Sequence, residues 1–317
     1  MRTESVKLTI LTSSVQKSLW SLKSLIMLLW KSMNKDLYGG HYAVTRSLVQ
    51  GLKELKFGFN YNPNCLKELA DTVLVLSDLD ALRQMIRLKR IGRINKILAG
   101  PNLVVIPSDD RELIAAPEID TYLVNSKWTL QAYIDDEPLL SRNCISWAAG
   151  VDTQYWKPAS LMTLDKKILL YHKNAPQDLC DFCVLKVSEL GYIPDIIRYS
   201  EYDFELYLKK LHSCDAVIFL SQSESQGIAL AEAWSTDLPT LVWNPGSITY
   251  NNKVIESSSA PYLTSQTGMF FKGRSDFEQA FLSLIKTKEQ FSPRKWVLEN
   301  MSDRLCATNL LRIAGFL

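Results

Sequence analysis

Residues 216–243 read AVIFLSQSESQGIALAEAWSTDLPTLVW, and they carry the strongest indication of how this chain folds. The two ends, Ala216–Leu220 and Thr240–Trp243, are short apolar runs of the kind that forms parallel strands buried on both faces. Between them lies a loop of small polar residues and then a helical pattern near Gly227–Ser235. The stretch therefore predicts a βαβ unit, in which ligands bind beyond the carboxyl end of the first strand.

Two carboxylates in this unit, Glu224 and Glu232, stand eight residues apart. Eight residues are close to a whole number of helical turns, so the two side chains face the same way. Gly227 lets the backbone approach a ligand at the start of the helix, where free N–H groups favour an anionic phosphate. Because carboxylates repel phosphate, we expect them to bind sugar hydroxyls; a solvated helix face with two surface acids is the alternative.

The whole run resembles the E-x7-E segment of retaining GT-B glycosyltransferases of family four. The corresponding residues are Glu224, Ser225, Gly227, Ile228, Leu230, Glu232, Ala233 and Pro239. Two positions depart from the family pattern: Ser225 replaces its first glycine, and Gln226 replaces its aromatic residue. The resemblance implies that Glu224 contacts the hydroxyls of the donor sugar and that Glu232 contacts the ribose. It also implies that the phosphates meet the backbone N–H groups of a donor-binding loop made of Ser225, Gln226, Gly227 and Ile228.

A second match lies in the segment AGVDTQYWKP at 149–158, which resembles the NGVDxxxFxP segment of the same family, with Trp156 in the aromatic place. It indicates the fold rather than the catalysis. The resemblance covers about residues 39–310 and implies an α/β protein of the GT-B class, with two Rossmann-like doubly wound domains facing a cleft. The acceptor-side domain would comprise 1–150, joined by a C-terminal helix at about 295–317 that crosses back, and the nucleotide-sugar domain would comprise 151–294.

The rest of the chain repeats the alternation of strands and helices, and its 317 residues suffice for two domains. The sequence predicts strands within 6–13 and at 72–77, 102–107, 121–125, 144–148, 167–171, 195–198, 216–220 and 240–243. It predicts helices at 80–94, 128–134, 177–190, 204–213, 227–235, 275–288 and 293–314.

Cations that could bind a diphosphate follow the first strand of the second domain, which ends in LLYHKNAPQD. The family places an Arg and a Lys there, and Lys173 stands at the position of the Arg. No second Lys follows at the expected distance, so either one of the two cations is missing, or Arg198 or Lys253 supplies it from elsewhere in the chain. A lysine is a point-charge phosphate ligand without the bidentate fork of arginine. The alternative for Lys173 is a solvated loop lysine.

In the first domain, Gly39–Gly40 precede a helical pattern and resemble the family's first loop, which lies against both the acceptor and the donor phosphate. Gly40 is therefore a donor-binding candidate. His41 is a catalytic candidate, because a histidine at a helix N-terminus is favoured in its neutral form and could bond a phosphate or a hydroxyl. Asp109, after the predicted strand 102–107, is a candidate for orienting the acceptor hydroxyl. Capping or packing roles are the alternatives for His41 and Asp109.

Two features of the first domain raise the question of a membrane. The first is a run of basic residues at 81–96 with no acid among them: Arg83, Arg87, Lys89, Arg90, Arg93 and Lys96. On a helix, positions 83, 87, 90 and 93 share a face that suits anionic lipid, whereas the lack of interleaved aromatics disfavours nucleic acid. The second is Leu19–Met33, which is shorter than the about 20 residues of a bilayer span. An interfacial helix or a buried helix, and a solvated basic face, stay open as alternatives.

Cys180 and Cys183 form the one CxxC pair of the chain, and the chain has three His, so a zinc site is not expected. The pair falls in a helical pattern and is interpreted as buried thiols in a reduced cytoplasmic compartment. The expectation is therefore a cytoplasmic protein with no metal and no cofactor, whose contact with an anionic membrane would be peripheral.

The sequence favours a glycosyltransferase that moves a sugar from a nucleotide diphosphate sugar to a hydroxyl acceptor, such as a glycan or a lipid-linked glycan. Retention of the anomeric configuration is implied by the resemblance. Two alternatives stay open: a sugar-nucleotide isomerase or hydrolase on the same fold, and a non-catalytic scaffold, which the missing second Lys and the altered loop glycine would explain. A redox Rossmann enzyme is disfavoured, because no GxGxxG occurs among the 13 glycines.

Overall fold

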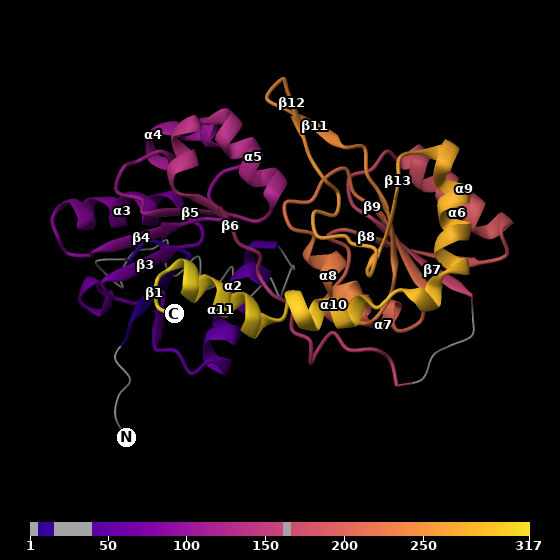
Figure 1. The fold of residues 1–317 in the computed structure, drawn as a ribbon, viewed down its shortest axis with the longest axis horizontal. Coiled ribbons are helices and arrows are strands. Elements are labelled where there is room, and N and C mark those ends of the chain that lie inside the picture. The colour runs from indigo at the N-terminus through magenta and orange to yellow at the C-terminus, as the bar shows by residue number, and fades with distance from the viewer. Residues whose placement is uncertain (1–5, 16–39, 161–165) are drawn as a thin grey trace. The chain divides into compact units, whose positions relative to one another are not determined.

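The computed structural model describes residues 6–15, 40–160 and 166–317. The chain forms two compact units: unit 1 is Met1–Ala148 with Ala307–Leu317, and unit 2 is Ala149–Cys306. Each unit has its own parallel β-sheet flanked by helices (Figure 1).

Unit 1 contains a six-stranded sheet in the order β2-β1-β3-β4-β5-β6, and every pair of neighbouring strands is parallel. Its strands are β1 (Leu8–Leu11), β2 (Phe59–Tyr61), β3 (Thr72–Val75), β4 (Lys96–Ala99), β5 (Thr121–Val124) and β6 (Cys144–Ser146). Its helices are α2 (Gly40–Glu54), α3 (Leu79–Arg90), α4 (Arg111–Ile114) and α5 (Lys127–Asp136), joined by most of α11 (Asp303–Ile313).

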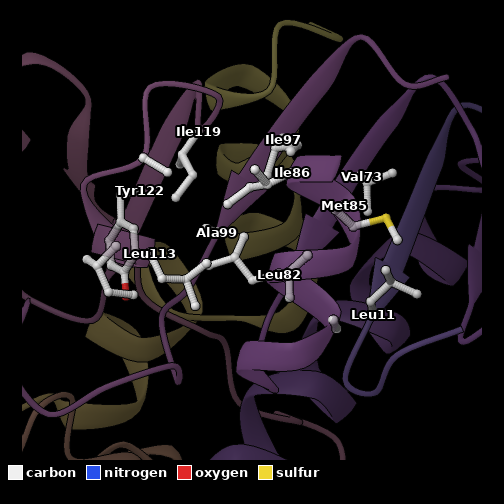
Figure 2. Close-up of a cluster of buried hydrophobic side chains, with 14 of the residues drawn as sticks. Leu11, Val73, Leu82, Met85, Ile86, Ile97, Ala99, Leu113, Ile119 and Tyr122 are labelled. Carbon is white, nitrogen blue, oxygen red and sulfur yellow. The ribbon is translucent and has the colours of Figure 1, made fainter. Parts of the chain in front are cut away.

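The core of unit 1 forms because α3 presents apolar residues at helical spacing to buried apolar residues of the sheet. Leu82, Met85 and Ile86 lie on one face of α3 and are 4% exposed or less. They pack in a cluster with strand residues such as Val73 and Ile97 (Figure 2). Removing this apolar area from water is the main contribution to the stability of such a layer.

The predicted strand at 102–107 is wrong, because the strand in this part of the chain is β4. Gly100 turns the chain directly after it: its φ is +95°, and a Cβ there would lie 2.2 Å from the backbone oxygen of Leu123. Leu103 and Val104 still pack against the core, but from a loop. Buried loop residues and buried strand residues look alike in sequence, since both are apolar.

Unit 2 contains a five-stranded parallel sheet in the order β13-β10-β9-β7-β8. Its strands are β7 (Lys167–His172), β8 (Ile193–Arg198), β9 (Ala216–Leu220), β10 (Thr240–Trp243) and β13 (Gly268–Phe271). Its helices are α6 (Gln177–Glu189), α7 (Phe204–Leu211), α8 (Ile228–Ser235), α9 (Arg274–Lys286) and α10 (Pro293–Asn300). An antiparallel hairpin, β11 (Ser247–Tyr250) and β12 (Lys253–Glu256), follows β10.

Cys180 and Cys183 are buried thiols, as the sequence predicts. Both are fully buried on α6 and belong to the core cluster that includes Phe277 and Phe281 of α9. Burial raises the pKa of Cys183 to about 12, so this thiol stays protonated and unreactive.

The long helix predicted over 293–314 is broken into α10 and α11. The break lies beside the segment that leaves unit 1, where Val151 forms a bridge with Ser302. A Cβ on Gly150 would lie 2.5 Å from the Cα of Asp303, so only a glycine permits this close approach. Beyond the break the chain joins unit 1, where the Nζ of Lys96 donates to the backbone oxygen of Ala314 and Phe57 packs edge-on against Phe316.

The run of basic residues on α3 is partly neutralised by one acid of the helix itself and by acids that follow it in sequence. Arg83 pairs with Asp80 and Asp110, Lys89 pairs with Asp120, and Arg90 pairs with Glu118, whose pKa the Arg90 hydrogen bond lowers. The helix ends at Arg90, so Arg93 does not extend its basic face as predicted.

No helix among the described residues is long and apolar enough to cross a bilayer. The apolar segment Leu19–Met33 lies outside the described residues.

Candidate functional site

The centre of the candidate site is an ion pair at the carboxyl edge of the unit 2 sheet. Lys173 directly follows β7, and Glu224 lies in the loop after the neighbouring strand β9. The Nζ of Lys173 lies 2.9 Å from Oε1 and 2.9 Å from Oε2 of Glu224. The side chains are 25% and 15% exposed, so the pair is partly shielded from water but open to a ligand. Two residues that the sequence assigns to the donor therefore touch each other.

A second cation, Arg198, lies on the strand next to Lys173. It ends β8 and stands opposite His172 in the parallel register. Its Nη1 donates to Nδ1 of His172 at 3.0 Å and to Oε1 of Gln177 at 3.1 Å. With Nδ1 accepting, the imidazole donates through Nε2 to the backbone oxygen of Ala175 at 2.9 Å. Of the two predicted alternatives for the second cation, Arg198 is thus the one on a strand adjacent to β7.

Lys253, the other alternative, lies exposed on β12 of the hairpin. The ring of Tyr199, the residue after Arg198, faces the Lys173 ammonium, with Nζ 4.8 Å from the ring centroid. Lys173 therefore has a carboxylate and an aromatic face as neighbours.

The loop that carries Glu224 is held by several hydrogen bonds. The backbone N–H of Glu224 donates to the backbone oxygen of Ser258 at 2.9 Å, and the hydroxyl of Ser221 lies 2.7 Å from Oε1 of Glu224. The backbone N–H of Gln222 donates to Oδ1 of Asn174, the residue after Lys173, at 2.7 Å. The loops after β7, β9 and β12 thus form one connected network around the ion pair.

A glycine in the left-handed region precedes α8. Gly227 adopts a φ of +81° and precedes the first residue of the helix, Ile228. The first N–H groups of any α-helix have no hydrogen-bond partner within the helix. Ser225 is exposed and Ile228 is partly exposed, whereas Gln226 and Gly227 between them are buried.

The side chain of Gln226 is buried and binds the linker. It is 4% exposed, and its amide pairs with the backbone of Ala149 in both directions: Nε2 donates to the oxygen at 2.7 Å and Oε1 accepts from the N–H at 3.0 Å. Its assignment as a donor-binding residue can therefore concern only its backbone.

Glu232 lies within α8 and is 2% exposed. Glu232 interacts electrostatically with a group of tyrosines that the sequence analysis did not single out. Burial, and then the charges of nearby groups that include Glu232 and Glu224, raise the pKa values of Tyr202 and Tyr207. The Tyr202 hydroxyl donates to that of Tyr171 at 2.9 Å, so these phenols stay neutral hydrogen-bonding groups. The position of Tyr202 soon after the end of β8 was the available signal.

The candidates from unit 1 lie at the start of α2 and in a short 3-10 helix. Gly40 and His41 are the first two residues of α2, and the side chain of His41 lies outside the described part of the chain. Asp109 lies in a short 3-10 helix, and its Oδ2 accepts from the backbone N–H groups of Val105 at 3.2 Å and Ile106 at 3.1 Å. These bonds fit the capping alternative. Asp78 caps α3 by accepting from two backbone N–H groups of its first turn.

No protein-family model matches this chain, and no curated protein matches its sequence. Solved structures match it along most of its length. Anabaena HepE, crystallised with UDP and glucose, is 10% identical over 99% of this chain and 100% of its own, with a TM-score of 0.61. The apo form of the lipopolysaccharide outer core galactosyltransferase WaaB is 12% identical over 98% and 99%, with a TM-score of 0.62.

The catalytic domain of starch synthase IV from Arabidopsis thaliana, bound to ADP and acarbose, is 11% identical over 88% of this chain and 78% of its own, with a TM-score of 0.52. At these identities the likeness concerns the fold. The chain has two parallel-sheet α/β units and matches GT-B glycosyltransferase structures, which confirms the fold class expected from the sequence.

Proposed function

We propose that this protein is a glycosyltransferase that moves a sugar from a nucleoside diphosphate sugar to a hydroxyl of a glycan or a lipid-linked glycan, with retention of the anomeric configuration. The observation that carries the proposal is the contact between Lys173 and Glu224 at the carboxyl edge of the sheet. A cation for a diphosphate and a carboxylate for sugar hydroxyls lie within reach of one donor molecule. HepE was crystallised with UDP and glucose, and WaaB is named a galactosyltransferase, so both neighbours support the same class of enzyme.

In this proposal the chain supplies positive charge where the leaving diphosphate gains negative charge. Lys173 and the backbone N–H groups at the start of α8 would bind the phosphates, with Arg198 on the adjacent strand. Glu224 would accept hydrogen bonds from the sugar hydroxyls and hold the ring while its bond to phosphate lengthens. Glu232 would accept from the ribose hydroxyls.

The proposal is tested by thermal unfolding with UDP, ADP and GDP, each alone and as its glucose ester. We expect the nucleotides of one base to stabilise the protein against unfolding, by about 2.7 kcal/mol when the ligand concentration is 100 times its dissociation constant. Product analysis with and without a glycan acceptor then separates transfer from hydrolysis or isomerisation. Binding without any turnover would favour a scaffold, and no stabilisation by any of the six compounds would contradict the proposal.

Glu232→Gln is expected to weaken the binding of a nucleoside diphosphate by about 1–3 kcal/mol, because a charge-assisted bond to the ribose becomes a neutral one. The loss should be the same for the sugar nucleotide, since both ligands carry the ribose. Isothermal titration with ribo- and 2′-deoxyribonucleoside diphosphates measures it.

The wild type should discriminate between these two nucleotides, and Glu232→Gln should discriminate less. The matched control is Glu205→Gln on α7, where the glutamate is exposed. Equal discrimination by wild type and Glu232→Gln would mean that Glu232 does not bind the ribose.

A further inference from the structure

Ser221 is a buried serine whose single hydroxyl proton has a charged acceptor. It directly follows β9 and is fully buried. Its Oγ lies 3.2 Å from Oδ1 of Asn174, 3.2 Å from the backbone oxygen of Ser223 and 2.7 Å from Oε1 of Glu224. A hydroxyl donates one hydrogen bond, and the carboxylate is both the nearest acceptor and the strongest. The proton of Ser221 therefore goes to Glu224.

A sugar nucleotide that binds as proposed offers new partners to both members of the Lys173–Glu224 pair. The Lys173 ammonium occupies both carboxylate oxygens, which are the atoms that would accept from sugar hydroxyls. An ammonium donates three hydrogen bonds, so Lys173 can turn toward a diphosphate, and the hydroxyls of the sugar can then take its place as donors to Glu224. The ion pair is thus a resting arrangement whose two members exchange partners.

The bond from Ser221 does not involve the cation, so it persists through this exchange. We propose that Ser221 is a positioning residue, which holds Oε1 of Glu224 in place while Lys173 moves from the carboxylate to the donor diphosphate. This inference rests on the proposed function. It predicts that Ser221 matters for ligands that carry a sugar and not for the nucleotide alone, because the nucleotide alone has no group for Glu224.

The experiment compares UDP, ADP or GDP, whichever stabilises the wild type most, with its glucose ester. Ser221→Ala should lower kcat/KM for the glucose ester about tenfold, the scale of one hydrogen bond to a charged group, and leave the affinity for the nucleoside diphosphate within twofold. Ser221→Thr keeps the hydroxyl and should restore most of the loss. The matched control is Ser259→Ala: this serine is also fully buried, but its hydroxyl donates to the backbone oxygen of Gln222 at 3.0 Å.

A second measurement covers the case in which threonine does not fit. In a Glu224→Ala background, Ser221→Ala should not change the affinity for the glucose ester, because its effect passes through the carboxylate. Equal weakening of both ligands by Ser221→Ala, or a full further loss in the Glu224→Ala background, would overturn the inference and leave the proposed function standing. If the wild type binds none of the six compounds, the proposed function fails, and the inference fails with it.

Discussion

Glu224→Ala is expected to lower the turnover of a nucleoside diphosphate sugar about 10²–10³-fold, the scale of one preorganised polar contact at the reacting centre. The same change should leave the affinity for the nucleoside diphosphate unchanged or make it tighter. In the ligand-free protein Glu224 holds the Lys173 ammonium through both oxygens, so it competes with phosphate for that cation. Removing the carboxylate removes the competitor, while the sugar loses its acceptor.

Steady-state kinetics for the sugar nucleotide and isothermal titration with the nucleoside diphosphate give the two numbers. The control is Glu205→Ala, which removes an exposed glutamate from α7. Wild-type turnover in Glu224→Ala would withdraw Glu224 from catalysis. A large loss of affinity for the nucleoside diphosphate would mean that Glu224 supports the fold of the loop rather than the sugar.

Lys173→Ala is also expected to lower turnover by about 10²–10³-fold. Unlike Glu224→Ala, it should weaken the affinity for the nucleoside diphosphate. Negative charge grows on the leaving diphosphate. The loss of the Lys173 ammonium therefore destabilises the transition state and also lowers the affinity for the nucleoside diphosphate. It also leaves the carboxylate of Glu224, 15% exposed, without its cation beside the phosphates, and the two negative charges repel. Lys173→Arg should retain part of the activity, because the charge remains.

The same kinetic and titration measurements apply, with Lys209→Ala on α7, an exposed lysine, as the control. A loss of less than about tenfold would indicate that another cation is the main phosphate ligand, and Arg198→Ala then becomes the variant to measure. Opposite shifts of nucleotide affinity in Lys173→Ala and Glu224→Ala would be the signature of one cation shared between carboxylate and phosphate.

The sequence predicted the βαβ unit at 216–243 because its strands are buried on both faces and so are apolar without interruption. It named Lys173 and Glu224 separately, but it could not bring them together. They are 51 residues apart, and their contact depends on β7 and β9 being neighbours in the sheet. Strand order is a property of the whole unit, which no local pattern contains.

Local patterns also failed where apolar residues do not form strands and where strands are not apolar. The run at 102–107 is a loop, whereas β2 (Phe59–Tyr61) was missed because it is a short edge strand that is only partly buried. The charge of α3 was misjudged for a related reason. Its acidic partners Asp110, Glu118 and Asp120 lie beyond the helix in sequence, so a count within 81–96 omits them.

Unit 1 is made of two pieces of chain, and this bears on how the protein is synthesised. Residues 307–317 leave the ribosome after all of unit 2, yet they supply the contacts to Lys96 and Phe57. Unit 2 is one continuous piece and can fold while the chain is still growing, whereas unit 1 begins first and is completed last. A chain that stops before residue 307 would therefore weaken the unit furthest from the missing residues in sequence, and a tag added after Leu317 would sit against unit 1 (Figure 1).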